Sequence, residues 1–199
     1  MCYNFFKQYL ERKNMKSFKR ITFNAPVTLT FALLSLAVLL LQGIFGSSFT
    51  YNFFCAYHSS LLNPLTYLRL FTHVLGHSGF SHYSGNMMLL LLLGPILEEK
   101  YGSKTLLAMI LLTSAIEGVI ITTFFNVAIM GASGIVFMFI ILASVVNVKE
   151  GEIPLTFIIV AALYIGREVI NGIVLNDNVS QLAHIIGGTC GGIFGSLLN

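Results

Sequence analysis

Apolar residues in this chain gather in long runs that are separated by short polar segments. A helix needs about 20 mostly apolar residues to cross the hydrocarbon core of a bilayer. Six runs approach this length, and we expect membrane spans at 26–45, 82–97, 105–125, 132–148, 155–173 and 179–198. The pattern therefore predicts an all-α, multi-pass membrane protein with six transmembrane helices.

The longest interval without an apolar run lies between the first two spans, at 46–81. Tyrosine and phenylalanine residues are scattered through it, and Asn63-Pro64 marks a turn. Aromatic side chains settle at the level of the lipid headgroups, and connections of this length are often functional. We expect a loop that lies in the headgroup region rather than an ordinary exposed loop.

Composition agrees with a membrane protein, because 56% of the residues are hydrophobic and only 10% are charged. Soluble domains carry about 25% charged residues, so the chain lacks the side chains for a water-facing surface. We expect residues 26–199 to form one membrane domain and residues 1–25 to form a separate basic segment.

Residues 1–25 contain six lysines and arginines but one acidic residue, Glu11. Positive charge before a first span marks the cytoplasmic side of the membrane. A cleaved signal peptide fits less well, because the following apolar run is too long and no cleavage site follows it. A nucleic-acid-binding arm would need a soluble nucleic-acid-binding domain after it, and the apolar remainder of this chain cannot form one. We expect both termini in the cytoplasm and the protein in the plasma membrane.

In this topology, spans two, four and six all begin at the outer face. Their first residues therefore lie at a similar depth, and they carry most of the reactive side chains. Polar groups within a bilayer are costly unless they face the bundle interior. We expect three clusters to meet there: His82 with Asn86, then Gly131-Ala132-Ser133-Gly134, then Gln181-Leu182-Ala183-His184.

Ser133 is the candidate nucleophile. A serine in a membrane helix often only bonds back to the preceding turn, but here Gly131 and Gly134 let backbone and substrate approach its hydroxyl. A helix N-terminus also offers free N–H groups for a developing oxyanion. The G-x-S-G pattern differs from the G-x-S-x-G elbow of soluble hydrolases.

His184 is the only histidine in the second half of the chain. It could serve as a proton relay or as a hydrogen bond between helices, and it becomes a general base if a serine lies beside it. Gly187, Gly191 and Gly195 recur at intervals of four and form a face for close helix packing. For His184 to act as the base for Ser133, span six would have to pack against span four, which carries the serine.

His82 and Asn86 are four residues apart and therefore share one helical face. A histidine and an amide that point at one position suit an oxyanion hole. His73 and His77 have a spacing that could bind a metal on a helix, with His82 or His58 added, but the segment contains no acidic residue and no cysteine except Cys55. We expect no metal and no cofactor.

These motifs resemble those of the rhomboid family of intramembrane serine proteases. In chain order they are FTHVLGH at 71–77 with HYSGN at 82–86, EEKYG at 98–102, GASG at 131–134, and AHIIGGTCG at 183–191. The likeness covers about residues 70–198. It implies a six-helix rhomboid-like bundle in which the segment after the first span is the membrane-embedded first loop.

The resemblance implies that Ser133 is the nucleophile and His184 the base, in a dyad without an acid. His82, Asn86 and the backbone N–H of Ser133 would form the oxyanion hole. Phe137 stands where family members often have a tyrosine stacked on the catalytic histidine. The chain has no tryptophan, so the Trp-Arg signature common in the family's first loop is absent.

The expected activity is hydrolysis of a peptide bond in or beside the transmembrane segment of a protein substrate. The alternative is a catalytically inactive rhomboid-like protein that binds membrane clients, although such relatives typically lack the serine or the histidine. A third class is a channel or transporter in which Glu117 and His184 form a proton path, but no inverted repeat is visible. We expect transmembrane proteins and the lipid bilayer as partners, and no nucleic acid.

Overall fold

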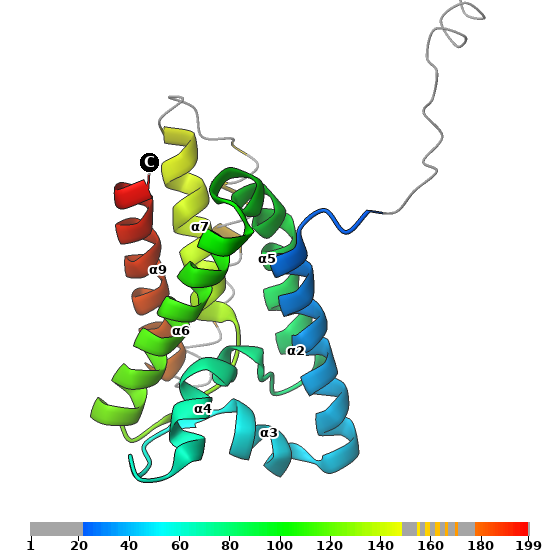
Figure 1. Ribbon diagram of the computed structural model, residues 1–199, viewed down its shortest axis with the longest axis vertical. Coiled ribbons are helices and arrows are strands. Elements are labelled where there is room, and N and C mark those ends of the chain that lie inside the picture. Colours follow the sequence, from blue (N-terminus) through cyan, green and yellow to red (C-terminus); the bar gives the residue numbers. More distant parts are fainter. Residues whose placement is uncertain are drawn as a thin grey trace, which may run out of the picture.

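The computed structural model describes residues 22–148 and 178–198, with isolated positions between them. The described part is helical apart from its connections and two short strands (Figure 1). Most of the predicted basic segment at 1–25 and most of the predicted span at 155–173 lie outside the described residues. The long helices are α2 (Pro26–Phe45), α5 (Phe80–Tyr101), α6 (Ser103–Phe124), α7 (Ser133–Val148) and α9 (Asn178–Leu198).

Four helices in the described part of the chain are long and apolar enough to cross a membrane: α2, α5, α6 and residues Gln181–Leu198 of α9. Helix α7 is also apolar, but its apolar stretch, Ser133–Ser144, is shorter. The predicted first span agrees with α2 at both ends. The other four predicted spans that fall on described residues correspond to helices whose ends differ by a few residues.

Helix α5 is longer than its apolar run because Glu98 does not end it. The Glu98 carboxylate is buried, and it accepts hydrogen bonds from the backbone N–H groups of Val27 and Thr28 at 2.9 and 3.0 Å and from the Thr28 hydroxyl. These groups belong to the open first turn of α2, which has no acceptors of its own. The helix ends instead at Gly102, where φ is +79°.

The segment between α2 and α5 is not one irregular loop. It contains α3 (Ser47–Phe54), α4 (Pro64–Thr72) and the 3-10 helix η1 (His73–Leu75), which lie across one end of the long helices in Figure 1. The Asn63 side chain accepts a hydrogen bond from the N–H of Leu65 and caps α4. Strand β1 (Ala56–Tyr57) pairs antiparallel with β2 (Ala128–Ile129), which joins this segment to the connection before α7.

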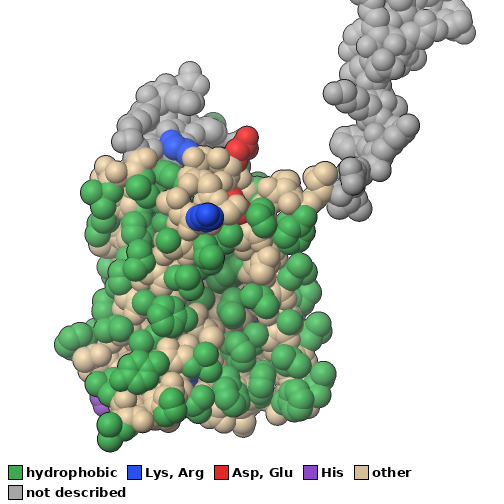
Figure 2. Space-filling view, viewed as in Figure 1, with side chains coloured by type: hydrophobic (Ala, Val, Ile, Leu, Met, Phe, Trp, Pro, Cys, Tyr) green, Lys and Arg blue, Asp and Glu red, His purple; other side chains and the backbone are tan. Residues whose placement is uncertain are grey.

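Apolar side chains cover most of the visible outer face, and charged side chains gather at the end where α5 and α6 are joined (Figure 2). Large residues such as Leu40, Ile96 and Leu107 are more than two-fifths exposed on this outer surface. Soluble monomers rarely expose apolar areas of this extent. This apolar surface is that of an integral membrane protein.

Helix α7 supplies much of the core. Ile135, Met138, Phe139 and Leu142 are completely buried among α5, α6 and α9. Of residues 133–141, only Phe137 and Ile141 are not fully buried. Ser133 is thus the first residue of a helix that is mostly enclosed by its neighbours.

Candidate active site

Ser133 is the first residue of α7 and follows a turn that requires glycine. The φ angle of Gly131 is +127°, a conformation that residues with a side chain rarely adopt. The N–H of Gly131 donates to the carbonyl oxygen of His73 at 2.9 Å. The turn is thereby fixed to η1, and Ser133 itself is nearly buried, with 9% of its surface exposed.

The closest helix packing in the site joins α7 to α9. A Cβ atom added to Gly187 would overlap the carbonyl oxygen of Gly134, and one added to Gly191 would lie 2.6 Å from the carbonyl oxygen of Met138. Both contacts advance by four residues along each helix, so the two helices run in the same direction and in register. Gly187 and Gly191 of the glycine face predicted from the sequence pack against α7, the helix of the predicted fourth span.

This register brings the beginning of α9, with His184, to the beginning of α7. The imidazole ring of His184 stacks on the phenyl ring of Phe137, with ring centroids 4.1 Å apart and planes tilted by 14°. Phe137 lies one turn after Ser133 on the same helix. The imidazole is therefore packed on a side chain of the helix that begins with Ser133, and the phenylalanine serves for this contact without a hydroxyl.

His82 and Asn86 come from the first two turns of α5 and lie beside Gly131. A Cβ atom added to Gly131 would lie 2.7 Å from Nε2 of His82 and 3.7 Å from Nδ2 of Asn86. Both side chains thus face the turn that precedes Ser133. The structure brings together the three clusters that the sequence places on three different helices.

A hydrogen-bond chain orients the Asn86 amide. Nδ1 of His77 lies 3.1 Å from the carbonyl oxygen of Leu75, which can only accept, so Nδ1 carries the proton. Nε2 of His77 is then an acceptor, and Nδ2 of Asn86 lies 3.2 Å from it and donates. On the other ring, Nδ1 of His82 lies 3.2 Å from the Ser78 hydroxyl. A hydroxyl that donates there leaves the N–H of His82 on Nε2, which faces Gly131.

Burial, with a smaller contribution from the neighbouring His82, lowers the pKa of His77 from 6.5 to about 4. His77 is therefore neutral near pH 7 and remains able to accept the hydrogen bond from Asn86. The sequence placed His77 in a candidate metal pair with His73 and in the first motif of the family resemblance, but gave it no contact with Asn86. In the structure the two rings have different partners, since His77 contacts Asn86 whereas His73 contacts Glu117.

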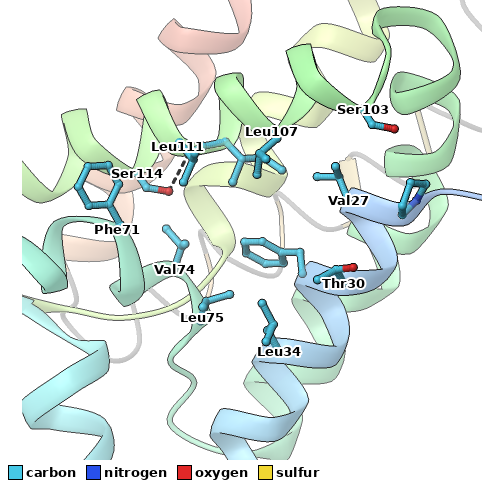
Figure 3. A pocket seen from close by; sticks show the side chains of 13 residues that line it. Val27, Thr30, Leu34, Phe71, Val74, Leu75, Ser103, Leu107, Leu111 and Ser114 are labelled. Atoms are coloured by element: carbon cyan, nitrogen blue, oxygen red, sulfur yellow. Dashed lines mark hydrogen bonds between the residues drawn. The ribbon is translucent and has the colours of Figure 1, made fainter.

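No group of three potential metal ligands occurs among the residues that the structure describes. The described part does contain an apolar cavity of about 420 Å³ between α2, α6 and η1 (Figure 3). Val27, Leu34, Leu75, Leu107 and Leu111 project into it. None of the candidate site residues lines this cavity, so it is a feature separate from the site.

Comparison with known proteins supports an assignment at the level of the family. No curated protein matches the sequence. The family model of the Rhomboid domain matches residues 64–199, which is more than half of the chain and includes every candidate site residue. This chain, with its apolar surface and its three polar clusters at the start of α5, α7 and α9, belongs to the rhomboid family.

Proposed function

We propose that this chain is an intramembrane serine endopeptidase that cleaves transmembrane proteins, with Ser133 and His184 as its catalytic dyad. Rhomboid proteins are generally serine intramembrane proteases, and both residues that the motifs require are present. The observation that carries the proposal is the contact of α7 with α9. Gly134 and Gly187 meet there, and His184 stacks on the ring one turn beyond Ser133.

In the proposed reaction, Oγ of Ser133 attacks the carbonyl carbon of the scissile peptide bond, while the imidazole of His184 takes the hydroxyl proton. The tetrahedral intermediate collapses when His184 passes this proton to the leaving nitrogen, which breaks the C–N bond and leaves an acyl-enzyme. Water then attacks the ester and gives one proton to His184, which returns it to Oγ. The ring of Phe137 would hold the imidazole in place for both transfers.

The negative charge that develops on the carbonyl oxygen needs donors that are already in place. We assign this role to Nε2–H of His82, to the amide of Asn86 and to the backbone N–H of Ser133. The proximity of both side chains to Gly131 supports the assignment. The open N-terminal turn of α7 adds a favourable electrostatic field for an anion.

The full architecture is part of the proposal. We propose six spans with both termini in the cytoplasm of a cell whose plasma membrane holds the protein, and a first loop, α3 to η1, embedded in the outer leaflet. The half-exposed Tyr51, Tyr67 and Phe71 on α3 and α4 support the embedded position, because aromatic rings settle at the membrane interface. The site would then open near the outer surface.

The test uses the full-length protein purified in detergent, a fluorescent fluorophosphonate, and a model substrate with a single transmembrane segment. We expect the wild type to be labelled and to cleave the substrate, and we expect folded Ser133→Ala to do neither. A wild type that does not react but still binds single-span proteins would instead support the inactive client-binding alternative.

A further inference from the structure

Glu117 is the one acidic residue in the middle of α6, and the proposed reaction does not use it. Its side chain is 1% exposed, and Oε2 lies 3.5 Å from Nε2 of His73, whose side chain is equally buried. Oε1 has no hydrogen-bond partner among the described residues. A carboxyl group inside a membrane protein is costly and normally marks a function.

The Glu117 carboxyl group fills the space beside Gly134. A Cβ atom added to Gly134 would overlap Oε1 of Glu117 and would lie 2.8 Å from Oε2. The carboxyl group therefore takes the place of a side chain at Gly134 and lies directly against the backbone of α7 next to Ser133. A change in its position would shift this backbone, because the two groups are in direct contact and packed interiors leave little free volume.

His73 contacts the other end of the same turn. Its carbonyl oxygen accepts from the N–H of Gly131 at 2.9 Å, while its side chain faces Glu117. The two residues thus hold both glycines of the G-x-S-G turn, with Ser133 between them. These contacts are with the backbone of the turn, so we place any role of the pair in the reaction there.

The hydrogen bonds of His73 also fix where protons are in this pair. Nδ1 lies 2.9 Å from the carbonyl oxygen of Arg69, which only accepts, so Nδ1 carries a proton. Nε2 and Oε2 would repel each other if neither were protonated. A proton on the histidine would make the pair an ion pair, and a proton on the carboxyl group would make it a neutral pair, with Nε2 and Oε2 facing each other at 3.5 Å.

We infer that Glu117 and His73 are a pair of positioning residues, which set the orientation of the Gly131–Gly134 turn and thus of the Ser133 hydroxyl and N–H. This inference rests on the proposed protease function. Stability alone gives no reason for the pair, because an apolar side chain of similar size often costs nothing or stabilises at a buried ionic site. The pair instead joins α6, η1 and α7 at the residue where geometry matters most.

The experiment compares Glu117→Gln with Glu117→Met in the full-length protein, by kcat and KM on the model substrate, by the rate of fluorophosphonate labelling, and by thermal melts. The glutamine keeps the shape, and its amide can donate to Nε2 of His73 without an added proton. The methionine keeps the length but cannot form this hydrogen bond. Ser114→Ala is the matched control, because it removes a buried polar group from the same helix whose hydroxyl donates to the Ile110 carbonyl.

We expect Glu117→Met to lower kcat and labelling by on the order of 10²-fold, as small misplacements of reacting groups do, with KM and Tm close to wild type. Glu117→Gln is expected to stay within about threefold of wild-type kcat, because its hydrogen bond replaces the lost one. The Ser114→Ala control should match the wild type. Together these results would support the positioning role, since a purely structural role predicts equal losses of activity and Tm.

Three results would overturn the inference alone while the wild type is active: wild-type kcat in Glu117→Met, a fall in kcat matched by a fall in Tm, or equally slow Gln and Met variants. If Glu117→Met does not fold, the kcat of Glu117→Asp tests the inference instead, because the carboxyl group of aspartate is one methylene too short to reach Gly134. Wild-type kcat in that variant would also overturn the inference. A wild type without labelling or cleavage refutes the proposed function itself, and the inference with it.

Discussion

The imidazole of His184 lies parallel to the phenyl ring of Phe137, at a centroid distance of 4.1 Å, on a helix that begins with Ser133. If Ser133 and His184 act as one unit, the loss of either removes the whole reaction path. We expect Ser133→Ala, His184→Ala and the double variant to lose activity to the same residual level, on the order of 10³-fold or more below wild type.

The comparison is made by cleavage of the model substrate, with thermal melts as the check on folding. Phe137→Tyr is a useful companion variant, because it keeps the aromatic ring and should retain activity. Losses in the double variant that multiply those of the single variants would show that the two residues act independently.

Asn86 is expected to contribute to the transition state and not to substrate binding. Loss of one oxyanion donor costs on the order of 10²–10³-fold in kcat in a soluble serine protease. We expect Asn86→Ala to lower kcat toward this range with little change in KM. Ser84→Ala, on the same helix and with its hydroxyl bonded to the Ser81 carbonyl, should leave kcat unchanged. An Asn86→Ala variant changed only in KM would contradict the oxyanion role.

His77 should make the protein sensitive to acid. Its pKa is about 4 in the folded protein against an ordinary value of 6.5, so the unfolded chain takes up a proton first as the pH falls. The stabilisation is present above about pH 6.5 and is lost as the pH approaches about 4. In His77→Gln, where the side-chain oxygen can still accept from Asn86, we expect a smaller fall of Tm over this range. Identical pH profiles of Tm in both proteins would exclude this role for His77.

Two glycines of α9 offer a matched test of the helix contact. A Cβ atom at Gly187 would overlap the backbone of α7, whereas one at Gly192 meets no atom of the described residues within 4 Å. We expect Gly187→Ala to lower the free energy of unfolding by about 1–3 kcal/mol and to reduce cleavage. Gly192→Ala should change it by less than about 0.5 kcal/mol. Unfolding in detergent measures both, and equal stability of the two variants would contradict the close packing.

Cysteine labelling can test the proposed orientation, although Cys55 is a poor reporter. Its thiol is 1% exposed, and burial raises its pKa to about 11 despite the opposing effect of the Arg69 charge. We expect it to resist maleimide in the folded protein. Leu62, which is 95% exposed in the first loop, is a better position. An impermeant maleimide on intact cells should label Leu62→Cys and spare Cys2, and the reverse pattern would invert the topology.

The sequence was sufficient to predict the ends of those helices that begin and end where the chain changes between apolar and polar residues. Helix α2 begins at Pro26 and ends before Gly46, and both residues mark ends in the sequence. For α5 the same rule was wrong, because Glu98 is charged in isolation but has hydrogen-bond donors from α2 in the fold. The helices α3 and α4 are amphipathic but only 8 and 9 residues long, too short to give an apolar run, and so they were predicted only as a loop.

For the candidate site, the sequence was enough to assign side chains to helices, but it was not enough to predict which side chains contact each other. Helical spacing was enough to put His82 and Asn86 on one face, and the glycine interval was enough to predict a close contact for α9. The partners of His73 and His77 could not be predicted, because Glu117 and Asn86 reach them only through tertiary packing. A lone Glu117 within an apolar span was the only signal of the first of these pairs.

The hydrogen bonds between Glu98 and the first turn of α2 have a consequence for the synthesis and membrane insertion of the protein. The acceptor for the N–H groups of Val27 and Thr28 lies about 70 residues later in the chain. Because the chain is synthesised from its N-terminus, we expect these groups to lack this acceptor until Glu98 has been made. When it arrives, it joins the beginning of one helix to the end of the other, and α2 and α5 become an antiparallel hairpin. We expect this hairpin to form as the nascent chain leaves the insertion machinery. The later helices, α7 and α9 among them, would then assemble against its surface.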